Sequence, residues 1–392
     1  MDQKIVDCRL SSLRITDVKT YYLEWPLSQP ARSLDGVTYT KKWPGLTLVK
    51  IFTDEGLVGI GGQHTTWTGW KNYLEDQVKS FVLKEIIEPF YVEKFSSHFC
   101  SKSPGADVAP GPNCVEIALW DLIGKAASQP IYKLLGARKD KVKAYLSLFP
   151  RYPPWTAEEA ANFTKEHHFL AVKVHRVTGD IEKDLSFISS LRAALGYGTE
   201  IMLDAEQAWM PSSIYDFGRA LKMAKGLERY DVAWFEDPLS WDRHPELVAK
   251  LAAAVDIPIA GGGRLYGAHK FKPLMVNDVL DIVQPDPQYS GGILEVKKIA
   301  MLADLYGKVC VPHGGMQDST GLCLAANLQV TGASDIPYLE YDLYPPAYDE
   351  KVRDRILKEP IVMRKDGYVY IPDKPGLGVE LDEEAVAKYI VL

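Results

Sequence analysis

The chain has 392 residues, 46% of them hydrophobic and 25% charged, with a formal net charge of −7. This length and balance are typical of a soluble globular protein of two or three domains and exclude the disordered class. No apolar run is long enough to span a membrane, and no basic run marks a nucleic-acid or anionic-lipid surface. The five cysteines are scattered without a CxxC pair and the N-terminus lacks a secretory signal. We therefore expect a protein of the reducing cytoplasm.

The first 130 residues are predicted to form a mixed α+β unit. Its expected elements are strands over residues 13–23, 46–52 and 57–62 and helices over residues 70–87 and 114–127. Asp54, Glu55 and Gly56 supply a hairpin turn before the third strand. Two loops rich in aromatic and polar residues, 25–43 and 63–70, separate these elements and are candidates for closing a site and selecting a substrate.

From about residue 141 the pattern changes to short β-rich runs that alternate with amphipathic helical segments. The runs cover residues 142–147, 171–175, 200–205, 232–236, 257–261, 281–285, 309–312 and 338–341. This alternation predicts βα units with a parallel sheet, and eight such runs favour a modified TIM barrel. An open doubly wound sheet is the alternative, but no GxGxxG sequence opens a βα unit. The tail has a Pro/Gly-rich turn at residues 375–378 followed by a short helix.

Ionisable residues stand at the carboxyl end of almost every run, where TIM barrels carry their chemistry. In chain order they are Lys173, His175, Asp204, Glu206, Glu236, Asp286, His313 and Glu340. Because the strands are parallel, we expect these side chains to meet at one rim of the barrel.

Three motifs in this order resemble the enolase superfamily, and within it the mandelate racemase subgroup. They are ALWDLIGK at 118–125, WFEDP at 234–238 and VPHG at 311–314. The resemblance implies an N-terminal α+β capping domain (1–135), a (β/α)7β barrel (136–340) and a C-terminal segment (341–392) that packs back on the capping domain. It also implies Mg²⁺-assisted removal of the proton α to a carboxylate.

The resemblance assigns roles to several of the strand-end residues. Asp204 and Glu236 match two metal ligands, and Mg²⁺ prefers such oxygen donors. His313 matches the general base, with Asp286 fixing its tautomer and raising its basicity. Glu340 matches a carboxyl group that approaches the substrate carboxylate. A plain structural role at a strand end is the alternative for each.

Two positions depart from the usual pattern of the subgroup. Where a Lys-x-Lys motif is usual, the chain has Lys173-Val174-His175, so that Lys173 can bind a carboxylate and His175 can move a proton from the same face. Where the third metal-ligating Glu is usual, the chain has Gly263. Glu206, two residues after Asp204, is the candidate replacement; a general-acid role for Glu206 is the competing hypothesis.

The expected activity is dehydration of a sugar acid through an enediolate intermediate, which the Mg²⁺ would stabilise. A racemase, epimerase or cycloisomerase using the same first step is the alternative, with His175 and His313 as opposed acid/base groups. A relative that binds an acid or assembles structurally without catalysis is the alternative of another class. The expected partners are a small carboxylic acid and further copies of the chain in a homo-oligomer.

Overall fold

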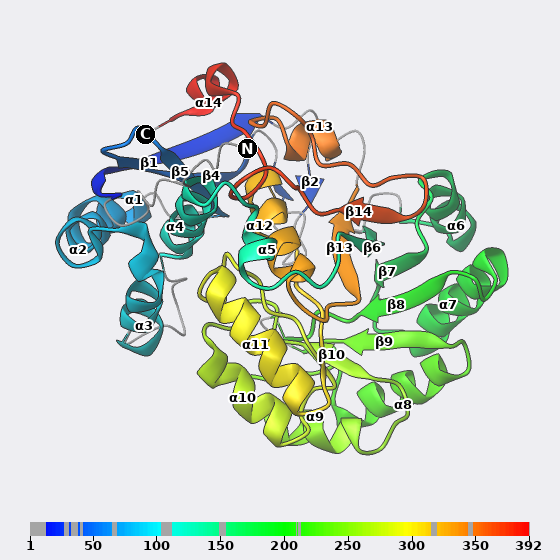
Figure 1. Ribbon diagram of the computed structural model, residues 1–392. Coiled ribbons are helices and arrows are strands. Elements are labelled where there is room, and N and C mark those ends of the chain that lie inside the picture. The colour runs from blue at the N-terminus through cyan, green and yellow to red at the C-terminus, as the bar shows by residue number, and fades with distance from the viewer. Residues whose placement is uncertain are drawn as a thin grey trace, which may run out of the picture.

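The computed structural model describes residues 13–26, 31–32, 38–39, 42–64, 69–102, 112–148, 154–208, 210, 213–314, 320–343 and 348–391. Figure 1 shows a smaller unit of strands and helices from the first part of the chain, lying beside a curled parallel sheet wrapped by helices. In this described part, no helix combines the length and the apolar character that a membrane crossing needs. More than half of the expected loop 25–43 and half of the expected loop 63–70 lie outside the described residues.

The smaller unit is built on an antiparallel sheet in the order β1-β4-β5. The strands are β1 (Ile15–Pro26), β4 (Lys42–Thr53) and β5 (Val58–His64), with a separate short pair of β2 (Ala31–Arg32) and β3 (Thr38–Tyr39). The turn before β5 uses Gly56 at φ +76°, a conformation that favours glycine. Gly61 of β5 lets the sheet approach the next helix closely, because an added Cβ would lie 2.0 Å from the carbonyl oxygen of Cys114.

The helices of this unit are α1 (Gly69–Tyr73), α2 (Lys79–Phe81), α3 (Val92–Lys102), α4 (Asn113–Ala126) and α5 (Ile131–Leu134). Helices α1 and α4 contact the sheet directly, whereas α3 and α5 pack on α4. The predicted helix over 70–87 is correct in extent but mixed in type, since Leu74–Val78 and Val82–Ile86 are π-helical. Helix α4 is buried along almost its whole length, so it joins the sheet to the barrel instead of presenting a polar face to water.

The eight predicted β-rich runs all form strands of one sheet. The strands are β6 (Lys141–Leu148), β7 (Ala171–His175), β8 (Glu200–Asp204), β9 (Val232–Glu236), β10 (Ile259–Gly261), β11 (Ile282–Val283), β12 (Val309–Cys310) and β13 (Tyr338–Asp342). They are parallel and pair in the order β12-β11-β10-β9-β8-β7-β6-β13. Among the described residues no strand pairing closes the sheet between β12 and β13, so the barrel has a seam there.

Seven helices follow the first seven of these strands in the described chain, which gives the predicted (β/α)7β order. They are α6 (Ala157–Glu166), α7 (Ile181–Leu195), α8 (Phe217–Glu228), α9 (Pro245–Ala252), α10 (Ala268–Val276), α11 (Ile293–Leu305) and α12 (Gly321–Gly332). Local sequence fixes several of their starts: the Thr156 side chain accepts from the backbone of Glu159 while Glu159 reaches back, a capping box. The fold is therefore a modified TIM barrel with an α+β capping domain.

The inside of the barrel is filled by side chains from successive strands of the sheet. Tyr145, Met202, Trp234, Ile282 and Val311 belong to one buried cluster. The large rings of Tyr145 and Trp234 meet edge to face with centroids 5.4 Å apart. This apolar cluster fills the barrel interior beneath the polar rim. The rim therefore lies above a packed core and does not open into a channel.

The last part of the chain contacts both units. It contains α13 (Glu350–Arg353), β14 (Tyr368–Tyr370) and α14 (Glu383–Tyr389). Strand β14 pairs antiparallel with β6 of the barrel. Beyond it, the backbone N–H of Val391 donates to the carbonyl of Tyr22, and Lys50 pairs with Glu383 at 2.5 Å.

Candidate active site

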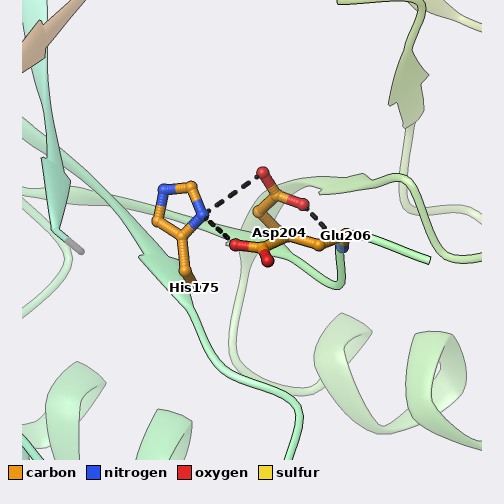
Figure 2. A group of neighbouring side chains, drawn as sticks. All are labelled: His175, Asp204 and Glu206. Carbon is orange, nitrogen blue, oxygen red and sulfur yellow. Dashed lines mark hydrogen bonds and ion pairs between the residues drawn. The ribbon is translucent and has the colours of Figure 1, made fainter. Parts of the chain in front are cut away.

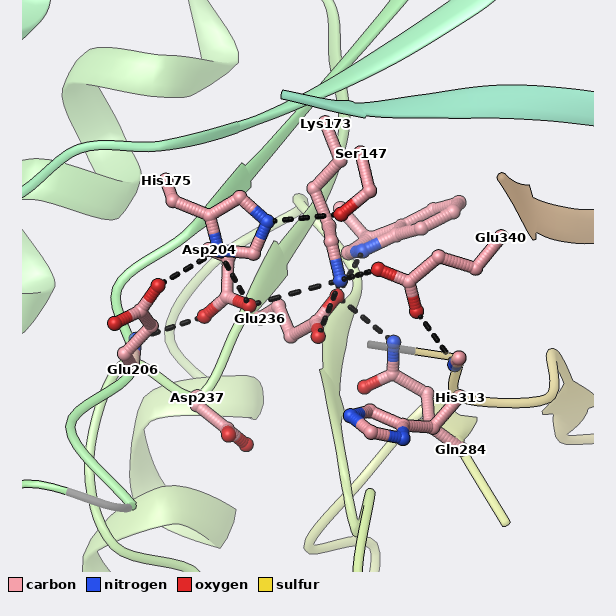
Figure 3. A network of polar contacts seen from close by, with 12 residues as sticks. Ser147, Lys173, His175, Asp204, Glu206, Glu236, Asp237, Gln284, His313 and Glu340 are labelled. Carbon is pink, nitrogen blue, oxygen red and sulfur yellow. Dashed lines mark hydrogen bonds and ion pairs between the residues drawn. The ribbon is translucent and has the colours of Figure 1, made fainter. Parts of the chain in front are cut away.

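The carboxyl ends of five barrel strands, β6 to β9 and β13, align so that their polar side chains converge. In the strand register His175 lies beside Asp204, and Asp204 beside Glu236. On the other side Ser147 of β6 lies beside both Lys173 and Asp342. All of these residues except His175, which is partly covered, are buried. Figure 3 shows Ser147, His175, Asp204 and Glu236 gathered around the Lys173 amine.

Lys173 is the cationic centre of this cluster. Its Nζ lies 2.8 Å from Glu236 Oε1, 2.9 Å from Glu340 Oε1 and 3.6 Å from Asp204 Oδ2, and the residue is 1% exposed. Burial opposes the charged amine, but the carboxylates of Glu236 and Glu340 outweigh it and raise the pKa of Lys173 well above its usual value. Lys173 is therefore a permanent cation at the floor of the site.

Glu236 and Asp204 differ in how their negative charge is compensated. Glu236 accepts hydrogen bonds from Lys173, from Gln284 Nε2 at 2.8 Å and from Trp234 Nε1 at 3.1 Å. Although burial acts in the opposite direction, these partners lower the pKa of Glu236 to about 2. For Asp204, burial and the neighbouring Glu236 charge raise the pKa well above its usual value. An additional cation beside Asp204 would remove this imbalance.

Asp204 also belongs to a group of three possible metal donors, drawn in Figure 2. One ligand atom each of His175, Asp204 and Glu206 lie within 4.8 Å of one another. His175 Nδ1 is 2.7 Å from Glu206 Oε1 and 3.4 Å from Asp204 Oδ2. Glu206 stands at φ +55°, and its backbone N–H donates to Asp204 Oδ1 at 2.8 Å. This turn aims the Glu206 carboxylate back at the Asp204 side chain.

His313 and Asp286 form a second group on the other side of Lys173. His313 Nδ1 is 3.3 Å from Asp286 Oδ2, and the His313 side chain is 15% exposed. Asp286 is fully buried, and burial raises its pKa while the bond to His313 opposes the rise. With Nδ1 directed at Asp286, the Nε2 atom is the one that can exchange a proton with a substrate. The structure thus brings together the two residues expected to pair.

Glu340 links this second group to Lys173. Its Oε1 contacts the lysine, and its Oε2 accepts a hydrogen bond from the backbone N–H of Gly314 at 2.9 Å. Gly314 directly follows His313, so Glu340 holds the end of the base-bearing segment as well as facing the site. All eight residues expected from the sequence therefore lie within one connected rim (Figure 3) or, for Asp286, directly against it.

Gly263 is close to His313 and leaves no room for a third carboxylate on its strand end. A Cβ added at Gly263 would lie 2.8 Å from His313 Cδ2. The imidazole therefore packs directly on the glycine, in the volume that a longer side chain would need. Of the residues expected from the sequence, Glu206 is the carboxylate that lies with Asp204 in a group of possible metal donors.

Several residues of the site were not expected from the sequence. Ser147 Oγ is 3.0 Å from His175 Nε2, Gln284 donates to Glu236, and Gln288 contacts Asp286. Ser147 stands near the end of the first barrel strand, and Gln284 comes immediately after β11, so strand-end position was the available signal. Asp237 also ends a strand, but it accepts from Trp241 Nε1 at 2.7 Å and points away from Lys173 in Figure 3. Burial raises the pKa of Asp237 to about 7.

The barrel, the capping domain and this rim define an enolase-type α/β-barrel protein. Residues 16–136 match the N-terminal domain model of mandelate racemase / muconate lactonizing enzyme, and residues 155–385 match the enolase C-terminal domain-like model. The chain belongs to the mandelate racemase / muconate lactonizing enzyme family.

Relatives of known name span nearly the whole chain. The chain is 30% identical over 385 residues to arabinonate dehydratase of Saccharolobus solfataricus, covering 96% of this chain and 99% of the relative. It is 31% identical to D-galactarolactone cycloisomerase of Agrobacterium fabrum, covering 70% and 72% of the two chains. Among solved structures, 3,6-anhydro-D-galactonate cycloisomerase of Zobellia galactanivorans superposes with a TM-score of 0.79 at 27% identity, covering 97% and 100%.

Proposed function

We propose that the protein is a Mg²⁺-dependent dehydratase of a sugar acid. The observation that carries this proposal is the position of one buried cation, Lys173, between two histidines that each contact a carboxylate. The arrangement can bind a carboxylate at its centre and exchange protons on either side of it. The name of the arabinonate dehydratase relative supports the same chemistry for this chain.

Asp204, Glu236 and Glu206 are the residues that would hold the Mg²⁺. They offer oxygen donors, which this ion prefers, and Mg²⁺ can complete its octahedral shell with water and substrate. The charge count supports the assignment, because the carboxylates of Asp204, Glu236 and Glu340 face the single amine of Lys173 in the described cluster, and Glu206 adds a further carboxylate beside His175. When bound, Mg²⁺ would stabilise negative charge that develops on the substrate carboxylate.

The residues of the chain would then perform the proton transfers. Lys173 binds and orients the substrate carboxylate, and Glu340 lies beside it as a hydrogen-bonding partner. His313 Nε2 removes the α-proton, and Asp286 stabilises the imidazolium that forms. His175 donates a proton to the departing β-hydroxyl, with Glu206 holding its Nδ1 side. Loss of water between the α- and β-carbons gives an enol that becomes a 2-keto-3-deoxy acid.

A cycloisomerase or epimerase is the second candidate. His175 and His313 lie on opposite sides of Lys173 in Figure 3, which suits two-base chemistry on one α-carbon. The cycloisomerase relatives support this candidate. In that case His175 would protonate the α-carbon from the face opposite His313, and no hydroxyl would leave.

The deciding experiment is incubation with a panel of mono- and diacid sugars and their lactones in D₂O with Mg²⁺. Appearance of a 2-keto-3-deoxy acid supports the dehydratase, whereas deuterium at the α-carbon with inversion or ring opening supports the second candidate. His313→Asn is the control and is expected to lower the rate by about 10²–10⁴-fold. Absence of both products and of any Mg²⁺-dependent thermal stabilisation would favour a non-catalytic acid-binding protein. Three expectations stay predictions: the cytoplasmic location, the extents of the three segments of the chain and a homo-oligomeric assembly. Light scattering would check the assembly.

A further inference from the structure

Gln288 is a buried residue that contacts the proposed base pair and the capping domain at the same time. It lies two positions after Asp286 and is 1% exposed. Its backbone N–H donates to Asp286 Oδ1 at 2.9 Å, and its side-chain Nε2 donates to Asp286 Oδ2 at 3.1 Å. The same Oδ2 atom receives His313 Nδ1. Gln288 therefore fixes both oxygens of the carboxylate that orients His313.

The other contacts of Gln288 come from the capping domain. Its Oε1 accepts from the backbone N–H of His64, the last residue of β5, at 3.0 Å. Its carbonyl oxygen accepts from the Nδ2 of Asn113, the first residue of α4, at 2.8 Å. The adjacent Tyr289 repeats the link, with its hydroxyl 3.1 Å from His64 Nδ1. The capping sheet and its central helix both hold this short barrel segment.

The chemistry of the partners fixes the orientation of the Gln288 amide. A backbone N–H can only donate, so the atom facing His64 must be the oxygen, and an ionised carboxylate can only accept, so the atom facing Asp286 must be the nitrogen. A second donor, Cys323 Sγ, also faces the oxygen at 3.4 Å. Neither a hydrocarbon nor an ionised carboxylate of the same length can satisfy both ends.

We propose that Gln288 is a positioning residue. Through it, the orientation of the Asp286–His313 pair depends on the hydrogen bonds that the capping domain makes to Gln288. The inference rests on the proposed function in taking His313 as the base. The two hydrogen bonds from Gln288 favour the ionised form of Asp286 against its burial. An ionised Asp286 holds His313 Nδ1–H and stabilises the imidazolium, so the base is competent only while β5 and α4 keep Gln288 in place.

The test compares Gln288→Met, which keeps the length of the side chain and removes its polar atoms, with Gln329→Met. Gln329 is the matched control because its equally buried amide also accepts from a backbone N–H, that of Tyr132, and donates to the carbonyls of Pro372 and Leu377, outside the site. For Gln288→Met we expect kcat to fall about 10–100-fold with KM little changed, the usual effect of losing a partner of a catalytic group. For the control we expect kcat near the wild-type value.

A second readout does not require activity. The ring ¹⁵N signals of His313, identified by their loss in His313→Asn, should show the Nδ1–H tautomer in the wild type and a mixture of tautomers in Gln288→Met. If Gln288→Met keeps the wild-type tautomer, the inference is wrong even where kcat has fallen. If no substrate in the panel reacts, the proposed function fails while the tautomer still tests the contact.

Gln288→Glu guards against a variant that merely folds badly. The introduced carboxyl keeps the acceptor for His64 but can donate to Asp286 only when protonated. Asp286, His313, His64, Tyr289 and Cys323 are the titratable groups around this position. We expect the ratio of its kcat to that of the wild type to be higher at pH 5.5 than at pH 8.5. A ratio that does not change with pH would overturn the proposal.

Discussion

Gly263 offers the sharpest test of how the base is packed. A Cβ at this position would lie 2.8 Å from His313 Cδ2, 3.2 Å from Cγ and 3.4 Å from Nε2. Non-bonded carbons settle at about 3.5–4.0 Å, so in Gly263→Ala the ring must move by roughly 0.7 Å or more. The φ angle of Gly263 lies outside the left-handed region, so the alanine backbone itself is not strained.

The displacement acts on a contact that is already long. His313 Nδ1 is 3.3 Å from Asp286, and a movement away from the glycine has to be absorbed by this hydrogen bond or by the strand. A misplacement of about 1 Å in an active site can cost on the order of 10²-fold in rate. We therefore expect Gly263→Ala to lower the rate of α-proton exchange about 10–100-fold, with little change in KM or in unfolding temperature.

The assay is exchange of the substrate α-proton for deuterium, followed by ¹H NMR at saturating Mg²⁺. Gly314→Ala is the matched control, because its Cβ would meet Glu340 Cβ at 3.7 Å, an ordinary contact, on a residue that adjoins the same histidine. Its rate should stay within about threefold of the wild type, since a contact at this distance requires no neighbouring group to move. An exchange rate for Gly263→Ala as high as that of Gly314→Ala would refute the packing argument.

Three further changes test the charges around the site. Lys173→Met should raise KM for the acid. In EDTA it should also lower the free energy of unfolding by about 3–5 kcal/mol, because it leaves buried carboxylates unpaired. A loss below about 1 kcal/mol in urea unfolding would contradict the ion-pair network. Glu206→Gln should raise the Mg²⁺ concentration for half-maximal rate about tenfold and, because Glu206 also contacts His175 Nδ1, should lower kcat at saturating Mg²⁺; an unchanged Mg²⁺ titration would remove Glu206 from the metal site. Glu116 is buried between α4 and α11, and burial raises its pKa to about 8, so the folded state holds a proton that the unfolded chain releases near pH 4.5. The contribution of Glu116 to stability is present below pH 4.5 and is lost as the pH rises to about 8. Glu116→Gln should therefore flatten the fall in unfolding free energy between pH 5 and 8. Parallel curves for the wild type and the variant would show that Glu116 does not titrate in this range.

The order of the barrel strands could be predicted because each strand is a short buried run between helical segments. β7 and β9 have the predicted bounds, and the ionisable residues at their ends meet as expected. The π-helical turns of 70–87 could not be predicted, since their apolar spacing is also that of an α-helix. Strand-end position indicates that a residue faces the rim but not which neighbour it contacts.

Contacts across the sheet account for most of what the sequence left open. The bond from Ser147 to His175 depends on the register of β6 and β7, and the bond from Gln284 to Glu236 joins strands that do not follow one another in the chain. The contacts of Gln288 were still harder to predict from the sequence, because half of the residues that it contacts belong to the capping domain. The sequence also leaves open whether Gly263→Glu could supply a metal ligand; the contact of Gly263 with His313 predicts that the longer side chain would displace the base instead.

The two departures from the usual pattern of the family are best understood together. Gly263 removes a carboxylate from one side of the rim, and His313 packs into the space that results. On the other side His175 stands where a second lysine is usual, and its Nδ1 lies 2.7 Å from Glu206. Replacing lysine by a histidine, which can be neutral, removes a positive charge, while Glu206 offers a negative charge close to Asp204. The loss at position 263 and the gain at position 206 leave the number of rim carboxylates the same, which supports the proposal that Asp204, Glu236 and Glu206 together would hold the Mg²⁺.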